Sequence, residues 1–346
     1  MRKFIILLFI LYLLGIPVHA SDFVAPSAPN EAQQYMPVQQ KTFGEDVWYI
    51  IREALPDVLP TVHSAIKVCI SVLSICIITA LLKNMTNFSV RTVELIGAVS
   101  VGTLLLSSTK SFITLAIDTV ESICEYGKLL FPVMTGALAA EGGTTASASL
   151  YTGTVIFNTL LTNGLTKIVV PALYAYLAIS IVLSSYTVSI LKSLKSFIKW
   201  FMTWSLKISI FLFTGYLGFT KVISGSTDAI ALKATKMTIS GMVPVVGGMI
   251  SDASETVLLS VGVMKNTAGI YGVITLISIT IVPFMMIGVQ SIILKLTEGV
   301  CGLFATKSVI AIIHDIASCM DFLLALTGTV CTLLMISTVC FMKGVS

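Results

Sequence analysis

Three carboxylates recur on one side of an apolar stretch in the first half of the chain. Asp118, Glu121 and Glu125 are spaced i, i+3 and i+7, so a helix would place them on one face, opposite a face of Ile, Ala and Val side chains. Inside a membrane, aligned carboxylates can line a path for cations or protons, whereas at its edge they form an interface. The sequence favours the interface, and neutralising all three side chains tests the acidic lining.

Two segments of the same pattern interrupt the apolar sequence with proline and glycine. Residues 131–136 read Phe-Pro-Val-Met-Thr-Gly and residues 243–248 read Val-Pro-Val-Val-Gly-Gly, with the two prolines 112 positions apart. In lipid, interrupted helical backbone persists only inside protein or beside a water-filled cavity, so paired interruptions indicate a translocation or binding site. The alternative is that small residues simply allow close helix packing. The candidate residues are Pro132, Gly136, Pro171, Pro244, Gly247, Gly248, Asp252, Glu255 and Pro283.

Other polar residues give weaker signals. A lysine-rich stretch at 192–199 is typical of cytoplasmic anchoring, and residues 314–321, with one histidine and two aspartates, read as a solvated loop. Lys67 and Glu94 are candidates for a pair across the first two spans. The seven cysteines and three histidines lack metal-ligand spacing, so we expect structural thiols, no metal and no cofactor.

Motifs of enzymes are missing from the sequence. The chain contains no Gly-x-Ser-x-Gly, no His-Glu-x-x-His and no Gly-x-x-x-x-Gly-Lys-Ser/Thr loop. We therefore expect a protein that is not an enzyme, and any ATP-driven step must belong to a partner. The basic residues are scattered between apolar runs, so we expect no nucleic acid partner.

The elements that position these residues must lie in a lipid bilayer. The 346 residues are 56% hydrophobic and 11% charged, with a mean hydropathy of +0.98 and a net charge of +4. Roughly 25% charged residues are usual for a soluble domain. We predict an all-α, polytopic integral membrane protein with two broken or re-entrant helical regions at 110–165 and 221–269. Its six secure spans are Ser64–Leu82, Thr92–Thr109, Ile168–Ile190, Trp200–Thr220, Ile270–Leu294 and Phe322–Met342.

The N-terminal region differs from the rest of the chain. Arg2 and Lys3 precede a short apolar run and a small-residue pair at 18 and 20, which predicts a cleavable signal peptide, with an uncleaved anchor as the alternative. A polar, proline-containing arm follows, in which the apolar spacing at 43–59 predicts an amphipathic helix. The predicted units are a signal peptide at 1–20, an extracytoplasmic arm at 21–62 and a membrane domain at 63–346, with an expected pair of repeats at 92–190 and 200–295.

The region around the second Pro-Gly segment is similar to a known family. Residues 233–236 read Lys-Ala-Thr-Lys, residues 243–257 read Val-Pro-Val-Val-Gly-Gly-Met-Ile-Ser-Asp-Ala-Ser-Glu-Thr-Val, and residues 265–269 read Lys-Asn-Thr-Ala-Gly. Together with the signal, arm and polytopic body, this pattern resembles the stage III sporulation protein AE family of endospore-forming bacteria.

The resemblance implies a function that hydropathy alone does not reveal. It implies a multi-pass protein in the mother-cell membrane around the forespore, as a subunit of a sporulation channel or secretion-like complex. Its partners would be the other stage III sporulation A-type subunits and, through them, a protein of the forespore membrane. It would act as a platform or as a permease-like pore. The alternatives are a stand-alone secondary transporter with repeated halves and a purely structural membrane scaffold.

Overall fold

Nearly every residue described by the structure is helical. The structure is a computed structural model and describes residues 24–37, 42–85, 90–141, 144–160, 164, 167–185, 189–242 and 247–343, with the backbone alone for 217–262. No strand occurs in these ranges. The helices are α2 (Asn30–Gln33), α3 (Phe43–Met85), α4 (Val90–Ala140), α5 (Thr144–Leu160), α6 (Val170–Ser185), α7 (Ser189–Met242), α8 (Gly247–Cys301) and α9 (Lys307–Lys343).

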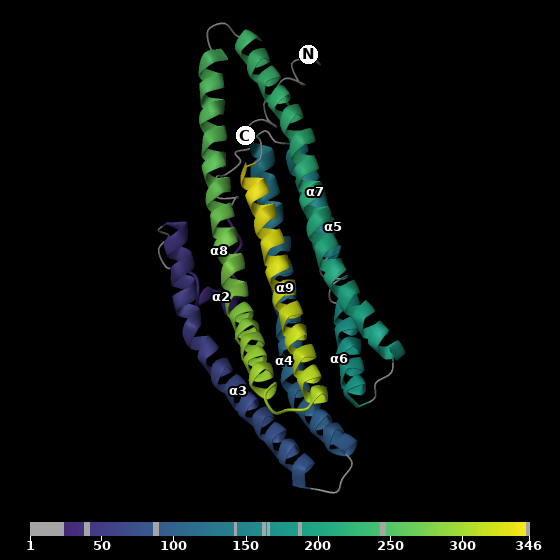
Figure 1. Cartoon of the computed structure of the whole chain (residues 1–346). Helices are drawn as coiled ribbons and strands as arrows, with labels where there is room; N and C mark the ends of the chain where they lie inside the picture. Colours follow the sequence, from purple (N-terminus) through teal and green to yellow (C-terminus); the bar gives the residue numbers. More distant parts are fainter. Residues whose placement is uncertain are drawn as a thin grey trace.

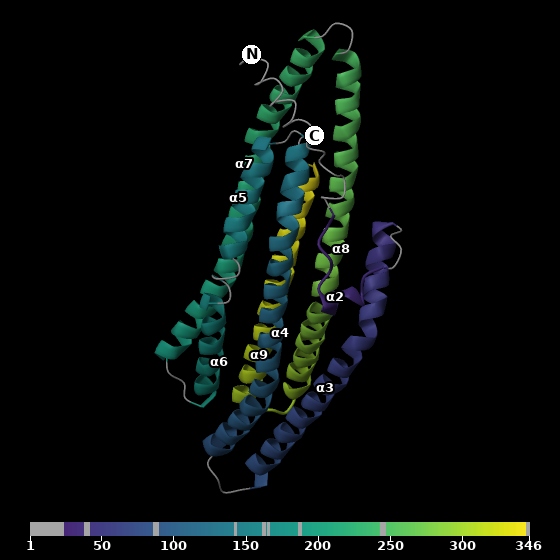
Figure 2. The ribbon, with the colours of Figure 1, turned by 180° about the vertical axis from the view of Figure 1, so that it is seen from behind.

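The helices form an elongated bundle (Figure 1). We call one end the base, where α3, α6 and α8 end and α4, α7 and α9 begin. The helices α4, α8 and α9 lie side by side, with α3 on one flank and α5, α6 and α7 on the other, as the view from behind also shows (Figure 2). The pair α7 and α8 extends beyond the rest of the bundle at the end opposite the base.

The longest helices exceed the thickness of a bilayer. The helix α4 has 51 residues, α7 has 54 and α8 has 55. At a rise of 1.5 Å per residue they reach roughly 75–85 Å, more than twice the ~30 Å of a hydrocarbon core. Each of these helices therefore combines a membrane span with a section outside the hydrocarbon.

Five helices of the described chain are long and apolar enough to cross a membrane. They contain the expected spans at 64–82, 92–109, 270–294 and 322–342, and the expected span at 200–220 as far as Tyr216. The expected span at 168–190 corresponds to a shorter apolar helix, Lys167–Leu183. The all-α membrane fold is thus confirmed. The helix of this sixth span, α6, ends at Ser185, and residues 186–188 of the predicted span lie outside the described residues.

The N-terminal arm packs against α8 and α3. The expected amphipathic helix at 43–59 is the first part of the continuous helix α3, which passes through the predicted boundary at 62. Its side chains Ile50 and Ala54 are buried with Ile274 of α8, and Tyr35 of the arm donates a hydrogen bond to Asp57. The predicted signal peptide lies outside the described residues.

The core lies where α4 and α9 meet α8. Leu130 and Phe131 of α4 are buried, and the ring of Phe131 stacks on Phe341 of α9 with 5.7 Å between centroids. A Cβ atom on Gly272 of α8 would come within 2.6 Å of a Leu130 methyl carbon. Glycine at this position therefore allows α8 to approach α4 closely.

The two predicted repeats run in the same direction. The helix α4 leaves the base and α5 with α6 return to it, just as α7 leaves the base and α8 returns (Figures 1 and 2). The alignment of 92–190 with 200–295 thus matches α4 to α7, and the returning helices α5 and α6 to α8. If the chain arose by duplication, the copies are parallel, because each contains an even number of passes along the bundle.

Candidate functional site

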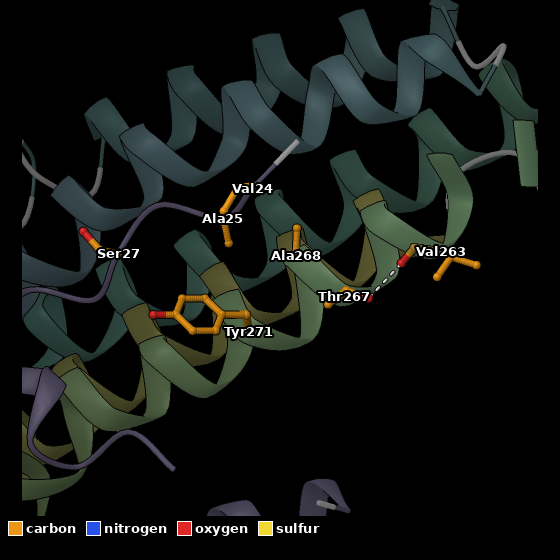
Figure 3. Close-up of a pocket in the computed structure, with 7 residues that line it drawn as sticks. All are labelled: Val24, Ala25, Ser27, Val263, Thr267, Ala268 and Tyr271. Atoms are coloured by element: carbon orange, nitrogen blue, oxygen red, sulfur yellow. Dashed lines mark hydrogen bonds between the residues drawn. The ribbon is translucent and has the colours of Figure 1, made fainter. Parts of the chain in front are cut away.

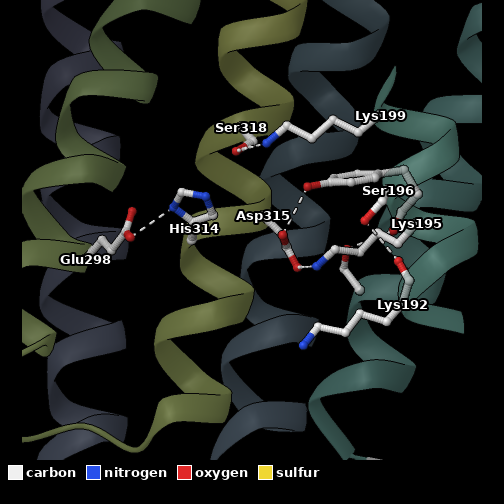
Figure 4. A network of polar contacts seen from close by, with 10 residues as sticks. Lys192, Lys195, Ser196, Lys199, Glu298, His314, Asp315 and Ser318 are labelled. Carbon is white, nitrogen blue, oxygen red and sulfur yellow. Dashed lines mark hydrogen bonds and ion pairs between the residues drawn. The ribbon is translucent and has the colours of Figure 1, made fainter. Parts of the chain in front are cut away.

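The most concentrated group of charges lies near the base, between α6, α7 and α9. Asp315 on α9 is 5% exposed. Its Oδ2 accepts a hydrogen bond from Lys195 Nζ of α7 at 2.5 Å, and its Oδ1 accepts one from the Tyr176 hydroxyl of α6 at 3.0 Å. Figure 4 shows Lys195 and Lys199 reaching from α7 towards α9. One buried carboxylate therefore joins three helices.

The network continues on both sides of Asp315. Lys199 Nζ donates to Ser318 Oγ at 3.3 Å, beside a cavity of about 230 Å³ that is also lined by Asp321. Asp321 accepts hydrogen bonds from Ser291 at 2.5 Å and Lys295 at 2.7 Å, both on α8. His314 Nδ1 lies 3.0 Å from Glu298 Oε1, as Figure 4 shows. We call the side chains around Asp315 and Asp321, together with this contact, the polar layer.

The position of the polar layer corrects the sequence interpretation. Residues 314–321 were expected in a solvated loop, but α9 begins at Lys307 and includes them. Val309, Ile312, Ile313 and Ile316 are all buried, because their spacing puts them on one helical face towards the core. The same helix turns Asp315 inward, where Lys195 and Tyr176 compensate its charge.

The polar layer is suited to fixing helices in register rather than to catalysis. A buried carboxylate with two direct partners holds its neighbours in one arrangement, and removing Lys195 leaves its charge uncompensated. No group of three His, Cys, Asp or Glu side chains able to hold a metal ion occurs within the described ranges. The sulfur atoms of Cys76 and Cys301 lie 3.6 Å apart as free thiols at the contact of α3 with α8.

A second ion pair near the other end was not predicted. Lys265 of α8, whose side chain is 4% exposed, pairs with Glu141, the residue that follows α4. A Cβ atom on Gly269, one turn further along α8, would come within 2.3 Å of Met342 of α9 and 3.1 Å of Met134 of α4, so glycine allows these helices to approach closely. The Lys-Asn-Thr-Ala-Gly segment thus joins α8 to α4 and α9. A lone lysine within a long apolar region was the available signal for this pair.

The predicted acidic face lies on the exposed side of α4. Asp118, Glu121 and Glu125 are exposed, while the residues of the opposite face, Ile113 and Val120 among them, are buried. The helical spacing argument thus placed the carboxylates on one face. The interface at these carboxylates stays a prediction.

The first Pro-Gly segment does not interrupt its helix. The expectation that Pro132 and Gly136 break α4 is wrong, because α4 continues through both to Ala140. Pro132 is on the exposed side, while the neighbouring Phe131 and Met134 are buried in the core. Packing of this buried face maintains the helix although Pro132 removes one backbone hydrogen bond.

The other candidate residues occupy different environments. Pro171 is the second residue of α6 and Pro283 lies inside α8. Pro244 lies outside the described residues. The glycines at 247 and 248 begin α8, which also carries Asp252 and Glu255, but the side chains of this stretch are likewise outside the description. The prediction of a polar path at the second segment therefore stays a prediction.

The pair predicted between Lys67 and Glu94 is replaced by another. Glu94 at the start of α4 pairs with Lys83 at the end of α3, with 3.4 Å between Nζ and Oε1. The partner is nearer in sequence because α3 and α4 are antiparallel and meet at the base, which brings residues close to the connection together.

An apolar cavity lies where the N-terminal arm crosses α8 (Figure 3). It has a volume of about 530 Å³. Among its described lining residues the only polar side chains carry hydroxyls, and none is charged. The arrangement suits packing or an apolar group and does not suit chemistry. Its lining residues are Val24, Ala25, Ser27, Val263, Thr267, Ala268 and Tyr271.

Comparison with known proteins decides the family. The family model described as stage III sporulation protein AE matches residues 31–344, nearly the whole chain. The chain belongs to the stage III sporulation protein AE family. It is similar to stage III sporulation protein AE of Bacillus subtilis (strain 168), with 27% identity over 227 residues. This alignment covers 64% of the chain and 56% of the relative, a little more than half of the latter's length. No solved structure matches the chain.

Proposed function

We propose that this member of the stage III sporulation protein AE family is a non-enzymatic membrane subunit of a channel or secretion-like complex that links mother cell and forespore. It would reside in the mother-cell membrane around the forespore. Its partners would be the other subunits of the stage III sporulation A-type complex and, through them, a protein of the forespore membrane. The family assignment supports the sporulation role, and the bundle of long apolar helices supports the membrane role.

The extension of α7 and α8 is the observation that carries the proposal. Both helices contain apolar spans and then continue beyond the remaining bundle (Figure 1). Helices of 54 and 55 residues are about 80 Å long. After the ~30 Å needed to cross the hydrocarbon core, the remaining length is similar to the full thickness of a bilayer with its headgroups. A paired helical projection of this kind offers soluble partners a rigid docking element outside the membrane.

The interior of a single copy favours the platform over the pore. The centre between α4, α8 and α9 is filled by buried side chains such as Leu130, Ile287 and Leu334. The buried carboxylate of Asp315 is neutralised by Lys195 and bonded to Tyr176 rather than left to line a path. A pore would therefore have to form between copies or between subunits.

Substitution at the second Pro-Gly segment tests the proposal. Replacing Gly247 and Gly248 with Leu alters the start of α8 at the tip of the extension. We expect loss of late forespore gene expression. A platform predicts that the partner subunits no longer co-purify, whereas a pore predicts that they still do.

Gly299→Leu is the matched control, because this glycine of α8 has open space around it. It should leave expression and co-purification unchanged. Normal late gene expression in the Gly247 and Gly248 variant would contradict both versions of the proposal at this site.

The parallel helix pairs keep a stand-alone secondary transporter as the second candidate, because internal repeats are common in transporters. Purified protein reconstituted alone in liposomes tests this function. We expect no solute uptake without partners. Uptake by the isolated protein would contradict the role of a subunit that depends on a complex.

A further inference from the structure

The outer side of α7 carries one charge among large apolar side chains. Trp204, Ile208 and Phe211 are 47%, 40% and 78% exposed, and Lys207 lies between them, also exposed. Lys207 has no ion pair or side-chain hydrogen bond within the described part of the chain. In lipid, the charged Lys207 side chain is energetically costly unless an opposite charge pairs with it. In water, the surrounding exposed apolar side chains would need a packing partner to bury them. The α7 stripe, residues 204–211, is therefore an incomplete surface in either environment.

The opposite charge is exposed on α4. Asp118, Glu121 and Glu125 form the α4 stripe, and none of them has an ion pair with any other described residue. The closest cation along this face is Lys128, also exposed, which leaves an excess of negative charge. The α4 stripe and the α7 stripe are thus complementary in charge.

The two stripes lie at the same height along the bundle. Helix α5 connects them, because Asn158 donates a hydrogen bond to the Cys124 carbonyl of α4 at 2.9 Å, while the neighbouring Phe157 stacks on Phe213 of α7 at 4.0 Å between centroids. Cys124 and Phe213 are therefore level. The helices α4 and α7 both run away from the base. The position six residues before Cys124 and the position six residues before Phe213 therefore both lie about 9 Å closer to the base.

Those six residues lead to Asp118 on α4 and Lys207 on α7. Within one copy α5 and α6 each contact both α4 and α7, and Lys207 forms no ion pair with Asp118, so the two stripes do not meet in the described structure. In a membrane, copies related by rotation about the bilayer normal keep each residue at its own depth. Two faces can meet in such an assembly only when they share a height, and these do.

We propose that the α7 stripe of one copy packs against the α4 stripe of a second copy. Lys207 then faces Asp118 and Glu121 of the neighbour, and the aromatic side chains around Lys207 cover this pair from lipid or water. Because two different faces meet, the contact is head-to-tail and repeats from copy to copy, which closes into a ring when the rotation permits. The proposal concerns self-assembly and does not depend on the conduit function.

Photo-crosslinking in native membranes tests the contact without altering the cysteines. Two differently tagged full-length copies are co-expressed, one of them with a benzophenone amino acid in place of Phe211. We expect a product that carries both tags and in which the probe is joined to residues 112–129 of the second copy. A probe at Ile78, exposed on α3 near the base, is the matched control and should not join to these residues.

Charge reversal determines whether the pair forms the contact. Lys207→Glu should reduce the double-tagged product about fivefold, and Asp118→Lys in the other copy should restore it. Three results would overturn the proposal: a probe joined only to lipid or to a different protein, a double-tagged product joined elsewhere on the second copy, or a yield unaffected by the reversal. The crosslinking yield is measured independently of the sporulation phenotype. The self-assembly proposal and the conduit proposal can therefore fail separately.

Discussion

Two ion pairs near the base, each between a lysine and a carboxylate, differ in how strongly the protein encloses them. Lys195–Asp315 is enclosed by α6, α7 and α9, with the side chain of Asp315 only 7% exposed. Lys83–Glu94 joins α3 to α4, with side chains that are 41% and 33% exposed. Loss of one partner leaves the other charge uncompensated in the first pair. In the second pair, solvent or lipid headgroups take the place of the lost partner. Burial rather than residue type therefore decides what each pair contributes.

The largest expected effect is that of Asp315→Leu. The change leaves Lys195, whose side chain is only 22% exposed, without a counter-ion and removes the acceptor of the Tyr176 hydroxyl. We expect a loss of about 3–5 kcal/mol in the free energy of unfolding. The check is the melting temperature of the detergent-purified protein, which should fall markedly below that of the parent.

Asp321→Asn provides the control on the same helix, because the Asp321 side chain is 45% exposed. Its effect should stay within about 1 kcal/mol. The double variant Lys195→Met with Asp315→Leu replaces the whole pair by apolar groups and should recover most of the stability. An equally unstable double variant would show that something other than the stranded charge causes the loss.

The double variant also sharpens the functional meaning of the polar layer. If it is stable and supports sporulation, the layer only fixes the helices. If it is stable but does not support late forespore gene expression, the charges themselves are required.

A contact without charge should give an intermediate effect. A Cβ atom on Gly153 of α5 would lie 1.9 Å from a ring carbon of Tyr216 on α7. Gly153→Ala therefore forces the ring away and breaks the 2.5 Å hydrogen bond from Tyr216 to the Ser149 carbonyl. Because Tyr216 is 37% exposed, we expect a destabilisation of about 1 kcal/mol relative to a glycine-to-alanine change without a clash, measured by the same melting experiment.

Gly215→Ala is the matched control, since nothing lies within 4 Å of a Cβ atom at this position of α7. Alanine favours helix over glycine, so this variant should be as stable as the parent or slightly more stable. A Gly153 variant that melts with the control would mean that Tyr216 does not join α5 to α7.

Hydropathy predicted the membrane fold because apolar length is a local property of the sequence. Continuity of helices was not predicted, since the effect of a proline depends on its surroundings. Pro132 lies on the exposed side of α4 while Phe131 holds the buried side, and this arrangement is tertiary. The spacing of Val309, Ile312 and Ile316 was sufficient to predict a helix around Asp315, but the charges nearby favoured a loop.

The pairing of charges required the fold. Asp315 and Lys195 are 120 residues apart, and Glu141 and Lys265 are 124 apart. No local pattern links such positions, because their proximity follows from the packing of α7 on α9 and of α8 on α4. The acidic face of α4 could be predicted since all three carboxylates belong to one helix and their spacing alone defines the face.

The smallest effect is expected from Glu94→Gln at the exposed pair. The amide keeps the size of the side chain and removes its charge, and Lys83 remains accessible to solvent or lipid headgroups. The free energy of unfolding should change by no more than about 1 kcal/mol, and raising the salt concentration should shrink the difference, because exposed charges are screened. The measurement is the melting temperature of parent and variant at low and high salt. A loss as large as that of Asp315→Leu, or one insensitive to salt, would mean that this pair is shielded in the membrane and that exposure in the isolated chain does not distinguish the two regions.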